Sequence, residues 1–301
     1  MEHLGEIPPE RSAQGGTGVS GLRFAYGTNG LGDHRLADVI AWLADLGYAG
    51  VALTLDHHHL DPFAGNLSQR VRAIAGQLQA RGLGVVVETG ARFLLDPRRK
   101  HEPTLVSDSG RERRVDLLQR ACVIAAELGA PVVSCWSGAV PANVPAAVAW
   151  DRLLAGLDPV LASATRLGVR LGVEPEPGML VDTLDRWDLL ADRLGRPATL
   201  GLTLDLGHCR CLEPAPVPAC VRRAAADLVH VQIEDMRRGL HEHLYFGEGE
   251  MEFPPILAAL REIAYRGLVA VELTRHSHAA DRTVPGALAF LRAAERQEVA
   301  T

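Results

Sequence analysis

Short apolar runs alternate with segments of helical periodicity along almost the whole chain. Eight runs have the length of a strand and are rich in Val and Leu; they cover residues 22–26, 50–53, 84–87, 131–135, 170–173, 199–204, 228–233 and 268–273. Most of these runs are continuously apolar instead of alternating with polar residues. Continuous apolarity is typical of strands buried on both faces, as in a parallel sheet.

Helical periodicity fills the segments between the apolar runs. The predicted helices cover residues 36–46, 67–81, 111–128, 146–167, 184–194, 217–226, 255–265 and 285–296. Several of them are followed by a glycine shortly before the next strand, at Gly47, Gly82, Gly129, Gly168 and Gly267. Glycine is the preferred residue where a chain leaves a helix in a left-handed conformation, so these positions predict helix ends.

Eight strand–helix units within one chain of 301 residues predict an α/β fold, a single (β/α)8 TIM barrel with parallel strands. An open doubly wound sheet is the alternative, but it usually has a Gly-rich phosphate loop after the first strand, and residues 28–32 are a poor match to one. We expect the barrel to span residues 21–301. Residues 1–20 are polar and Gly-rich, and we expect a flexible N-terminal tail there.

Composition and charge narrow the functional classes. The net charge is −6 and no long basic run is present, which counts against a nucleic-acid partner. No segment has the apolar length of a membrane span, and the N-terminus lacks the features of a signal peptide, so we expect no membrane partner and a cytoplasmic protein. The five cysteines have no paired spacing, which indicates reduced thiols.

Four polar or acidic residues stand at or near the ends of successive predicted strands in the second half of the chain. They are Glu174, Asp205, Gln232 and Glu272. The C-terminal ends of parallel barrel strands meet on one face, so these side chains are expected to converge there. An oxygen-rich set suits one divalent ion such as Mn²⁺, Mg²⁺ or Co²⁺ better than a structural zinc, with Zn²⁺ left open. The alternative is that each residue caps the following helix.

Two local patterns strengthen the hypothesis of a site. In the segment 230–234, His230, Gln232 and Glu234 alternate with apolar residues, and a period of two sends all three side chains to the same face, here the barrel interior. His208 follows Asp205 by three residues, so its imidazole is expected to reach over a metal ion bound by the aspartate. Three inward polar groups in one strand are not the default for a structural interior.

Four segments of the chain resemble the xylose-isomerase-like TIM-barrel superfamily. They are Glu174-Pro175 and residues 201–208, 247–253 and 264–272. That superfamily includes sugar and cyclitol isomerases and epimerases, inosose dehydratase, 3-dehydroshikimate dehydratase and endonuclease IV. The resemblance extends from about residue 21 to the end, and its motifs specify the superfamily better than the substrate.

The resemblance implies roles for individual residues. It implies the same four metal ligands, with Glu174 and Glu272 also moving a proton beside the bound substrate. It further implies that His208 contacts a substrate oxygen and that Arg238 does the same after the seventh strand, with the neighbouring Arg237 as the alternative. We also expect substrate contacts from His230.

The chain departs from the common pattern of the superfamily at the seventh strand, where His-x-His is usual and His230-Val231-Gln232 is present. Some dehydroshikimate-dehydratase-like members have glutamine at this position, so Gln232 stays a candidate ligand through its carbonyl oxygen. The alternative nitrogen ligands are His230 and His243. The departure weakens the epimerase hypothesis and strengthens that of a lyase.

Further histidines and a long loop fall in predicted βα connections. Within the segment 57–59, His57 is the expected substrate contact. His241-Glu242-His243 lies near the place where endonuclease IV relatives bind additional zinc. The longest irregular stretch, residues 90–110, contains Arg92, Arg98 and Arg99 and is either a lid or a solvated insertion.

These observations favour a metal-dependent isomerase or epimerase that acts on an α-hydroxycarbonyl sugar or cyclitol by proton transfer through an enediolate. The alternative is a metal-dependent dehydratase or lyase for a keto-cyclitol or a dehydroshikimate-like substrate. An endonuclease IV-like phosphodiesterase and a non-catalytic barrel subunit fit less well. The expected partner is a small-molecule substrate, and a homodimer is left open.

Overall fold

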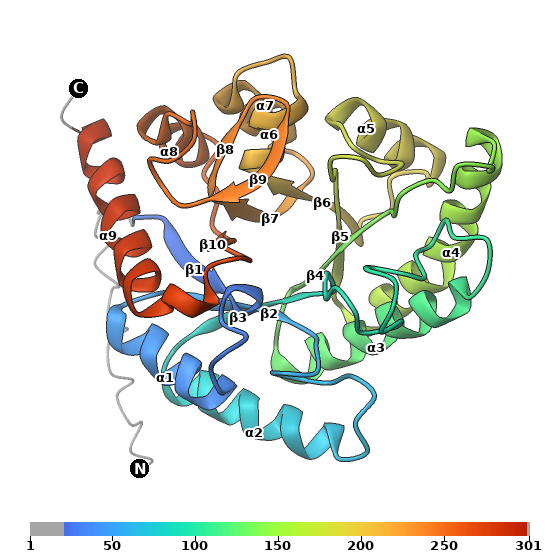
Figure 1. Ribbon diagram of the computed structural model, residues 1–301, viewed down its shortest axis with the longest axis horizontal. Helices are drawn as coiled ribbons and strands as arrows, with labels where there is room; N and C mark the ends of the chain where they lie inside the picture. Colours follow the sequence, from blue (N-terminus) through green and yellow to red (C-terminus); the bar gives the residue numbers. More distant parts are fainter. Residues whose placement is uncertain (1–20, 300–301) are drawn as a thin grey trace, which may run out of the picture.

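Eight parallel strands close into a barrel in the computed structural model, which describes residues 21–299 (Figure 1). The barrel strands are β1 (Arg23–Gly27), β2 (Gly50–Thr54), β3 (Gly84–Glu88), β4 (Val132–Trp136), β5 (Arg170–Glu174), β6 (Leu200–Asp205), β7 (Leu228–Ile233) and β10 (Leu268–Val271). Their order around the barrel is β1-β10-β7-β6-β5-β4-β3-β2, and β2 pairs with β1 to close it. The predicted TIM barrel is therefore confirmed, whereas the predicted tail of residues 1–20 lies outside the described residues.

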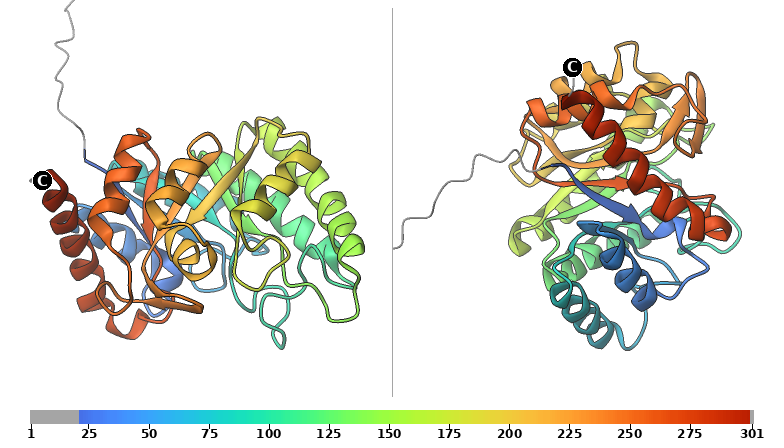
Figure 2. Two further views of the ribbon diagram at one scale, coloured as in Figure 1. Left: turned by 90° about the horizontal axis from the view of Figure 1, so that it is seen from above. Right: turned by 90° about the vertical axis from the view of Figure 1, so that its left-hand side faces the viewer.

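The helices form the outer layer of the barrel. They are α1 (Leu36–Leu46), α2 (Leu67–Ala80), α3 (Arg111–Leu128), α4 (Ala146–Leu167), α5 (Leu184–Arg193), α6 (Leu206–Leu212), α7 (Val217–Ala224), α8 (Phe253–Glu262) and α9 (Ala280–Val299), with 3-10 turns η1 (Thr28–Gly30) and η2 (Ser277–Ala279). Figure 2 shows α9, in red, lying along the outside of the barrel. Within residues 21–299, no helix combines the length and the apolarity needed to cross a membrane.

Several helix ends are set by glycine, as predicted. Gly47, Gly129 and Gly168 have φ angles of 90°, 72° and 68° and directly follow α1, α3 and α4. The prediction for Gly267 is wrong, because α8 ends at Glu262 and the left-handed residue there is Ala264, with a φ of 54°. A side chain at Gly267 would instead collide with the ring of Tyr265, so close packing explains this glycine.

Three elements differ from the pattern-based prediction. The short helix α6 and the antiparallel hairpin of β8 (Asp235–Arg237) and β9 (Leu240–Leu244) were not expected, because neither carries a long periodic apolar pattern. The last helix begins at Ala280, before Pro285, instead of at the proline. Figure 1 shows the hairpin, in orange, projecting beside the ends of β6 and β7.

The interior of the barrel has an apolar layer and a polar layer. Small apolar side chains from six strands, including Ala52, Val86 and Ala270, pack against one another as a separate cluster. Two residues further along the same strands stand Thr54, Glu88 and Glu272, and a period of two gives them the same face. The polar layer therefore lies at the C-terminal ends of the strands, above an apolar plug.

Candidate active site

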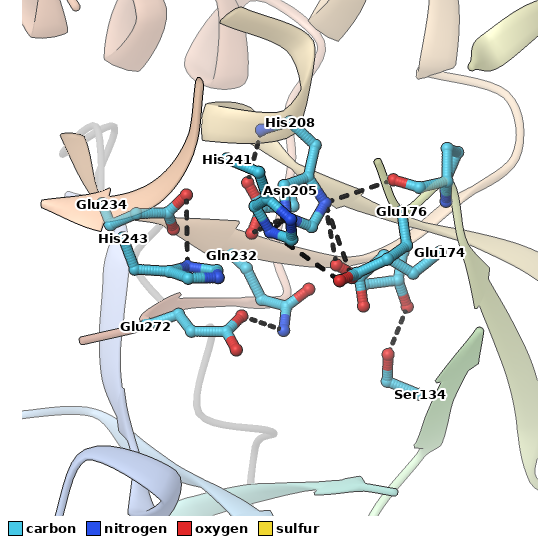
Figure 3. Close-up of polar contacts among 12 residues, drawn as sticks. Ser134, Glu174, Glu176, Asp205, His208, Gln232, Glu234, His241, His243 and Glu272 are labelled. Carbon is cyan, nitrogen blue, oxygen red and sulfur yellow. Dashed lines mark hydrogen bonds and ion pairs between the residues drawn. The ribbon is translucent and has the colours of Figure 1, made fainter. Parts of the chain in front are cut away.

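A cavity of about 640 Å³ opens at the C-terminal ends of the barrel strands. Its polar wall includes Glu88, Glu174, Gln232 and Glu272, which come from β3, β5, β7 and the end of β10. Loops after β1, β2, β3 and β10 complete the wall, together with His241 and His243 of the hairpin. The four predicted metal ligands lie together at this end of the barrel (Figure 3).

Asp205 is held by the helix that follows it. It ends β6 and caps α6, because its Oδ1 accepts a hydrogen bond of 2.8 Å from the backbone N–H of His208. Its second oxygen, Oδ2, is buried and has no hydrogen-bond partner. The expectation of a helix cap and the expectation of a ligand are thus compatible, since each oxygen has a separate task.

Gln232 lies between two carboxylates. Its Nε2 donates to Oε2 of Glu272 at 2.5 Å and to Oε1 of Glu88 at 3.3 Å. An ionised carboxylate only accepts, so when Glu272 is ionised, as metal binding requires, the amide nitrogen faces these two groups and the amide oxygen faces away from them. That oxygen, Oε1, is buried without a partner and is therefore available to a ligand or an ion.

Glu88 is a site residue that the sequence analysis did not identify. Its Oε1 lies 3.2 Å from Nε2 of His230, and its Oε2 accepts from Oγ1 of Thr54 at 3.3 Å. One sequence feature could have identified it: Glu88 stands at the end of the third predicted strand, as the four predicted metal ligands stand at or near the ends of later strands. It supports Gln232 from the other side of the barrel.

Glu234, which the alternating pattern of residues 230–234 directs to the barrel interior, is a further acidic group beside the site. It is fully buried, and neither of its oxygens has a hydrogen-bond partner. Its Oε1 lies 3.8 Å from Nδ1 of His243 on the hairpin. Gly207 makes room for it, because a Cβ at that position would collide with the carboxylate of Glu234.

Three imidazoles form one wall of the site. The Nε2 atoms of His208 and His241 are 3.0 Å apart, and one ring nitrogen from each of His208, His241 and His243 lies within 4.8 Å of the others. His208 also has its Nδ1 3.2 Å from Oε1 of Glu174. His241 and His243 line the cavity, whereas His208 lies behind them. The imidazole that meets the cavity is therefore that of His241 and not that of His208.

Burial and mutual repulsion set the protonation of the carboxyl groups. Burial raises the pKa of Glu174 to about 8, with His208 opposing it. Burial also raises the pKa of Glu234 and of Glu272 well above the usual value, and the charges of nearby carboxylates add to it. Without a cation, these acids would hold protons at neutral pH.

The histidines differ in charge. Burial alone lowers the pKa of His208, but Asp205, Glu176 and Glu174 outweigh it and raise that pKa well above its usual value. Burial, followed by the charge of His208, lowers the pKa of His241 to about 4. Burial also lowers the pKa of His243 to about 3. The cavity thus meets a neutral imidazole that is backed by an imidazolium.

The donor set fits a divalent cation. Single ligand atoms of Asp205, His243 and Glu272 lie within 4.8 Å of one another, and so do those of Glu174, Asp205 and His208. Buried oxygens of Asp205, Gln232 and Glu234 lack partners within the described chain. Uncompensated carboxylates in a buried site are costly, and a divalent ion would remove that cost. Oxygen donors in the majority suit Mg²⁺ or Mn²⁺.

Two predicted substrate contacts, His230 and Arg238, do not line the cavity. His230 is fully buried against Glu88 and does not line the cavity. The side chain of Arg238 donates to the backbone carbonyls of Arg210 and Glu213, away from the cavity. Of the two alternatives for a nitrogen ligand, His243 is in a group with Asp205 and Glu272, whereas His230 belongs to no such group among the described residues.

His57 lies at the mouth of the cavity. Its side chain is 61% exposed, and its Nδ1 lies 3.7 Å from Oδ2 of Asp61. The neighbouring His59 is buried instead, with Nε2 3.2 Å from the carbonyl oxygens of Leu31 and His34. The adjacent histidines therefore differ in environment: the exposed His57 and His58 line the cavity, whereas His59 is buried away from it.

Comparison with protein families gives one broad match. Residues 40–294, well over half of the chain, match the family model described as a xylose isomerase-like TIM barrel. The resemblance noted in the sequence is thus confirmed for the family.

Curated relatives match over shorter lengths. The uncharacterized protein MJ1311 of Methanocaldococcus jannaschii is 27% identical over 178 residues, which cover 56% of this chain and 60% of that protein. The rhizopine catabolism protein MocC of Rhizobium meliloti is 31% identical over 140 residues, which cover 41% of this chain and 42% of that protein. The matches thus span about three fifths and two fifths of these relatives.

Solved structures match over nearly the whole chain. A D-allulose 3-epimerase from Methylomonas sp. is 19% identical with a TM-score of 0.72, covering 91% of this chain and 98% of that one. The 3-keto-D-glucoside 4-epimerase YcjR from E. coli is 14% identical with a TM-score of 0.73, covering 90% and 99%. At these identities the likeness establishes the fold alone.

Proposed function

Because this chain belongs to the xylose isomerase-like TIM-barrel family, we propose that it is a divalent-metal-dependent isomerase or epimerase of an α-hydroxycarbonyl sugar or cyclitol. One observation carries the proposal: ligand atoms of Asp205, His243 and Glu272 lie within 4.8 Å of one another at the C-terminal face of the barrel. His243 and Glu272 line the cavity there, together with Gln232, whose Oε1 has no hydrogen-bond partner. The structural neighbours described as sugar epimerases support the same reaction class by analogy.

Glu174, Asp205, Gln232 and Glu272 would hold the ion, with His243 as an additional nitrogen donor. A bound divalent ion would supply Lewis-acid polarisation of the carbonyl oxygen of the substrate. The amide of Gln232 would contribute its oxygen, since Glu88 and Glu272 occupy its nitrogen.

Glu174 and Glu272 are the proposed proton carriers. They come from strands separated by β6 and β7, and Figure 3 shows them on opposite sides of Gln232. One glutamate removes the proton next to the carbonyl group, and the other returns a proton to the neighbouring carbon or to the opposite face. The raised pKa of Glu174, about 8, suits a group that gains and loses a proton near neutral pH.

His241 is the proposed hydrogen-bond partner of a substrate oxygen, and His208 is a positioning residue that acts through it. The two Nε2 atoms are 3.0 Å apart, and His241 lines the cavity. This assignment moves the role that the family resemblance implied for His208 to the imidazole in front of it. His208 keeps its proton because of the surrounding carboxylates.

A dehydratase or lyase on the same site is the second candidate, and Gln232 in place of the usual histidine favours it. In that reaction, removal of the proton next to the carbonyl is followed by loss of a β-hydroxyl group as water. The product is conjugated and absorbs ultraviolet light, whereas the product of an isomerase does not. Absorbance during turnover therefore separates the two reactions.

The first test combines metal analysis with proton exchange. We expect one Mn²⁺, Mg²⁺ or Co²⁺ ion per chain after reconstitution, and exchange of the α-proton of a ketose or cyclitol ketone with deuterium oxide, followed by NMR. Glu174→Gln and Glu272→Gln should each abolish exchange, and Glu272→Gln should also lose the ion. Glu112→Gln, an exposed change on α3, is the matched control.

Other outcomes are equally informative. Full exchange in either glutamate variant would contradict the proposal. Two or three zinc ions per chain would favour the phosphodiesterase instead. A chain that binds no ion under any condition would mean that the acidic cluster is structural.

A further inference from the structure

Three cations line the mouth of the same cavity. Arg92 and Lys100 lie on the loop between β3 and α3, and Arg275 lies on the loop after β10. All three side chains are exposed. Among residues 21–299, none of the three has a carboxylate oxygen within the 4.0 Å of an ion pair.

Backbone contacts bring the three residues together. Nη2 of Arg92 donates to the carbonyl oxygen of Thr274 at 3.2 Å, which places it beside Arg275 in the chain. The backbone N–H of His101 donates to the carbonyl oxygen of Arg92 at 2.5 Å, which folds the loop so that Lys100 returns to Arg92. The convergence of the three cations is therefore a property of the loop fold.

Some arginines elsewhere on this acidic chain contact two or three carboxylates each. Arg196 contacts Asp188, Asp192 and Asp227 at 3.1, 2.7 and 3.3 Å. Arg223 contacts Asp185 and Asp188 at 2.6 and 2.7 Å. The three cations at the cavity have no such partner among the described residues, so their charge is available to a ligand.

Lys100 is the single lysine of the chain, since the other basic residues are arginines. Its charge acts inward, because it contributes after burial to lowering the pKa of His101, which lines the same cavity, to about 4. The charge of Arg92 lowers the pKa of His101 in the same direction. The positive charges of Lys100 and Arg92 therefore act on a side chain that lines the cavity.

Two carboxylates also line the mouth, on the loops after β1 and β2. Oδ1 of Asp56 accepts the backbone N–H groups of His58 and His59, at 2.9 and 2.8 Å, and so caps its own turn. Asp33 is exposed and forms no ion pair among the described residues. Neither carboxylate neutralises the cations of the β3 and β10 loops.

We propose that the substrate carries an anionic group, a carboxylate or a phosphate, at the end opposite its hydroxycarbonyl group, and that Arg92, Lys100 and Arg275 bind it. The inference rests on the proposed function for the hydroxycarbonyl end. A volume of about 640 Å³ leaves room beyond the acidic floor for such a group. The acidic floor and the basic mouth then set the direction in which the substrate enters.

The test compares three ligands that differ only at carbon 6: D-fructose, D-fructose 6-phosphate and D-fructuronate. Their affinities for the Mn²⁺-loaded full chain are measured by calorimetry at low and high salt. We expect at least one anionic ligand to bind about tenfold more tightly than D-fructose, with the advantage reduced by salt. The phosphate and carboxylate arms identify which anion the site prefers.

Variants locate the effect. Lys100→Gln and Arg275→Gln should each reduce the advantage of the anion severalfold, whereas Arg98→Gln, on the same loop but outside the cavity lining, should leave it within twofold. Lys100 is the only lysine, so an amine-reactive acetylating reagent modifies no other lysine side chain. Peptide mass spectrometry then measures how fast this one side chain is acetylated. The anionic ligand should slow that acetylation, and D-fructose should not.

The outcomes separate this inference from the proposed function. If the metal-loaded chain binds all three ligands with equal affinity, or binds none of them detectably, the proposal of an anionic substrate is wrong. Either result would leave the proposed metal site unaffected. An anion advantage that survives both Lys100→Gln and Arg275→Gln would also overturn the proposal of an anionic substrate. Loss of the metal ion itself would instead contradict the proposed function on which the inference rests.

Discussion

The amide nitrogen of Gln232 lies 2.5 Å from Oε2 of Glu272, so two of the predicted metal ligands are hydrogen-bonded to each other. The same nitrogen lies 3.3 Å from Oε1 of Glu88. Two acceptors on one side of an amide determine its orientation, which leaves Oε1 of Gln232 for an ion. The family resemblance implies a histidine at this position, and the glutamine found here has Glu88 as the second acceptor of its amide nitrogen.

We predict that Glu88→Ala lowers metal affinity by about 10- to 100-fold, because the amide of Gln232 loses one of its two anchors. Competition with a metal-binding dye measures the affinity, and the visible spectrum of the Co²⁺-loaded protein reports the ligand geometry. In a Gln232→Ala background there is no polar side chain for Glu88 to orient, so the same change should cost much less. Equal losses in both backgrounds would contradict a positioning role for Glu88.

The metal-free protein is predicted to lose stability as the pH rises. Burial raises the pKa of Glu174 from 4.5 to about 8, and it raises those of Glu234 and Glu272 well above their usual value. An acid with a higher pKa in the folded chain binds more protons when folded, so its stabilising contribution is complete below the unfolded pKa and is lost as the pH rises through the folded pKa.

Thermal unfolding of the metal-free chain between pH 6.5 and 8 measures this effect, and the midpoint should fall across that window. Below pH 6.5 the lowered pKa values of the buried His101, His241 and His243 oppose it, because the unfolded chain then binds more protons at these histidines than the folded chain does. Metal binding requires deprotonated carboxylates, so the stabilisation that Mn²⁺ adds should grow over the measured window and release protons. A midpoint that rises with pH in the metal-free chain would contradict the protonation assigned to these acids.

Gly207→Ala is predicted to displace the side chain of Glu234 and so to disturb the candidate metal site. The new Cβ would collide with the carboxylate of Glu234, which is fully buried. We expect a loss of about 1–3 kcal/mol of stability and weaker metal binding, measured by urea unfolding and by dye competition. The matched control is Gly65→Ala, where a Cβ meets no atom within 4 Å. An unchanged metal affinity would show that the position of Glu234 does not affect the ion site.

Arg238→Ala is predicted to act on stability and not on substrate affinity. The side chain donates to the carbonyl oxygens of Arg210 and Glu213 and so joins the hairpin to the end of α6. We expect about 1–2 kcal/mol of destabilisation with little change in KM. A large rise in KM with unchanged stability would restore the substrate contact that the family resemblance implied.

The sequence alone determined the barrel and most of the acidic and polar residues of its candidate metal site. Strands buried on both faces are continuously apolar, so a polar residue at a strand end stands out, as Glu174, Asp205 and Glu272 do. Because parallel strands end on one face, these side chains converge for any closed barrel. The family and the fold followed from the same local patterns.

Only the tertiary structure decided how the side chains divide their tasks. Glu88 comes from the opposite side of the barrel, and no local pattern connects it with Gln232. The β8–β9 hairpin places His241 in front of His208 and turns Arg238 away, because the path of that loop depends on its packing against α6. Strand ends follow a local period of two, whereas loop positions depend on long-range contacts that the local sequence does not encode.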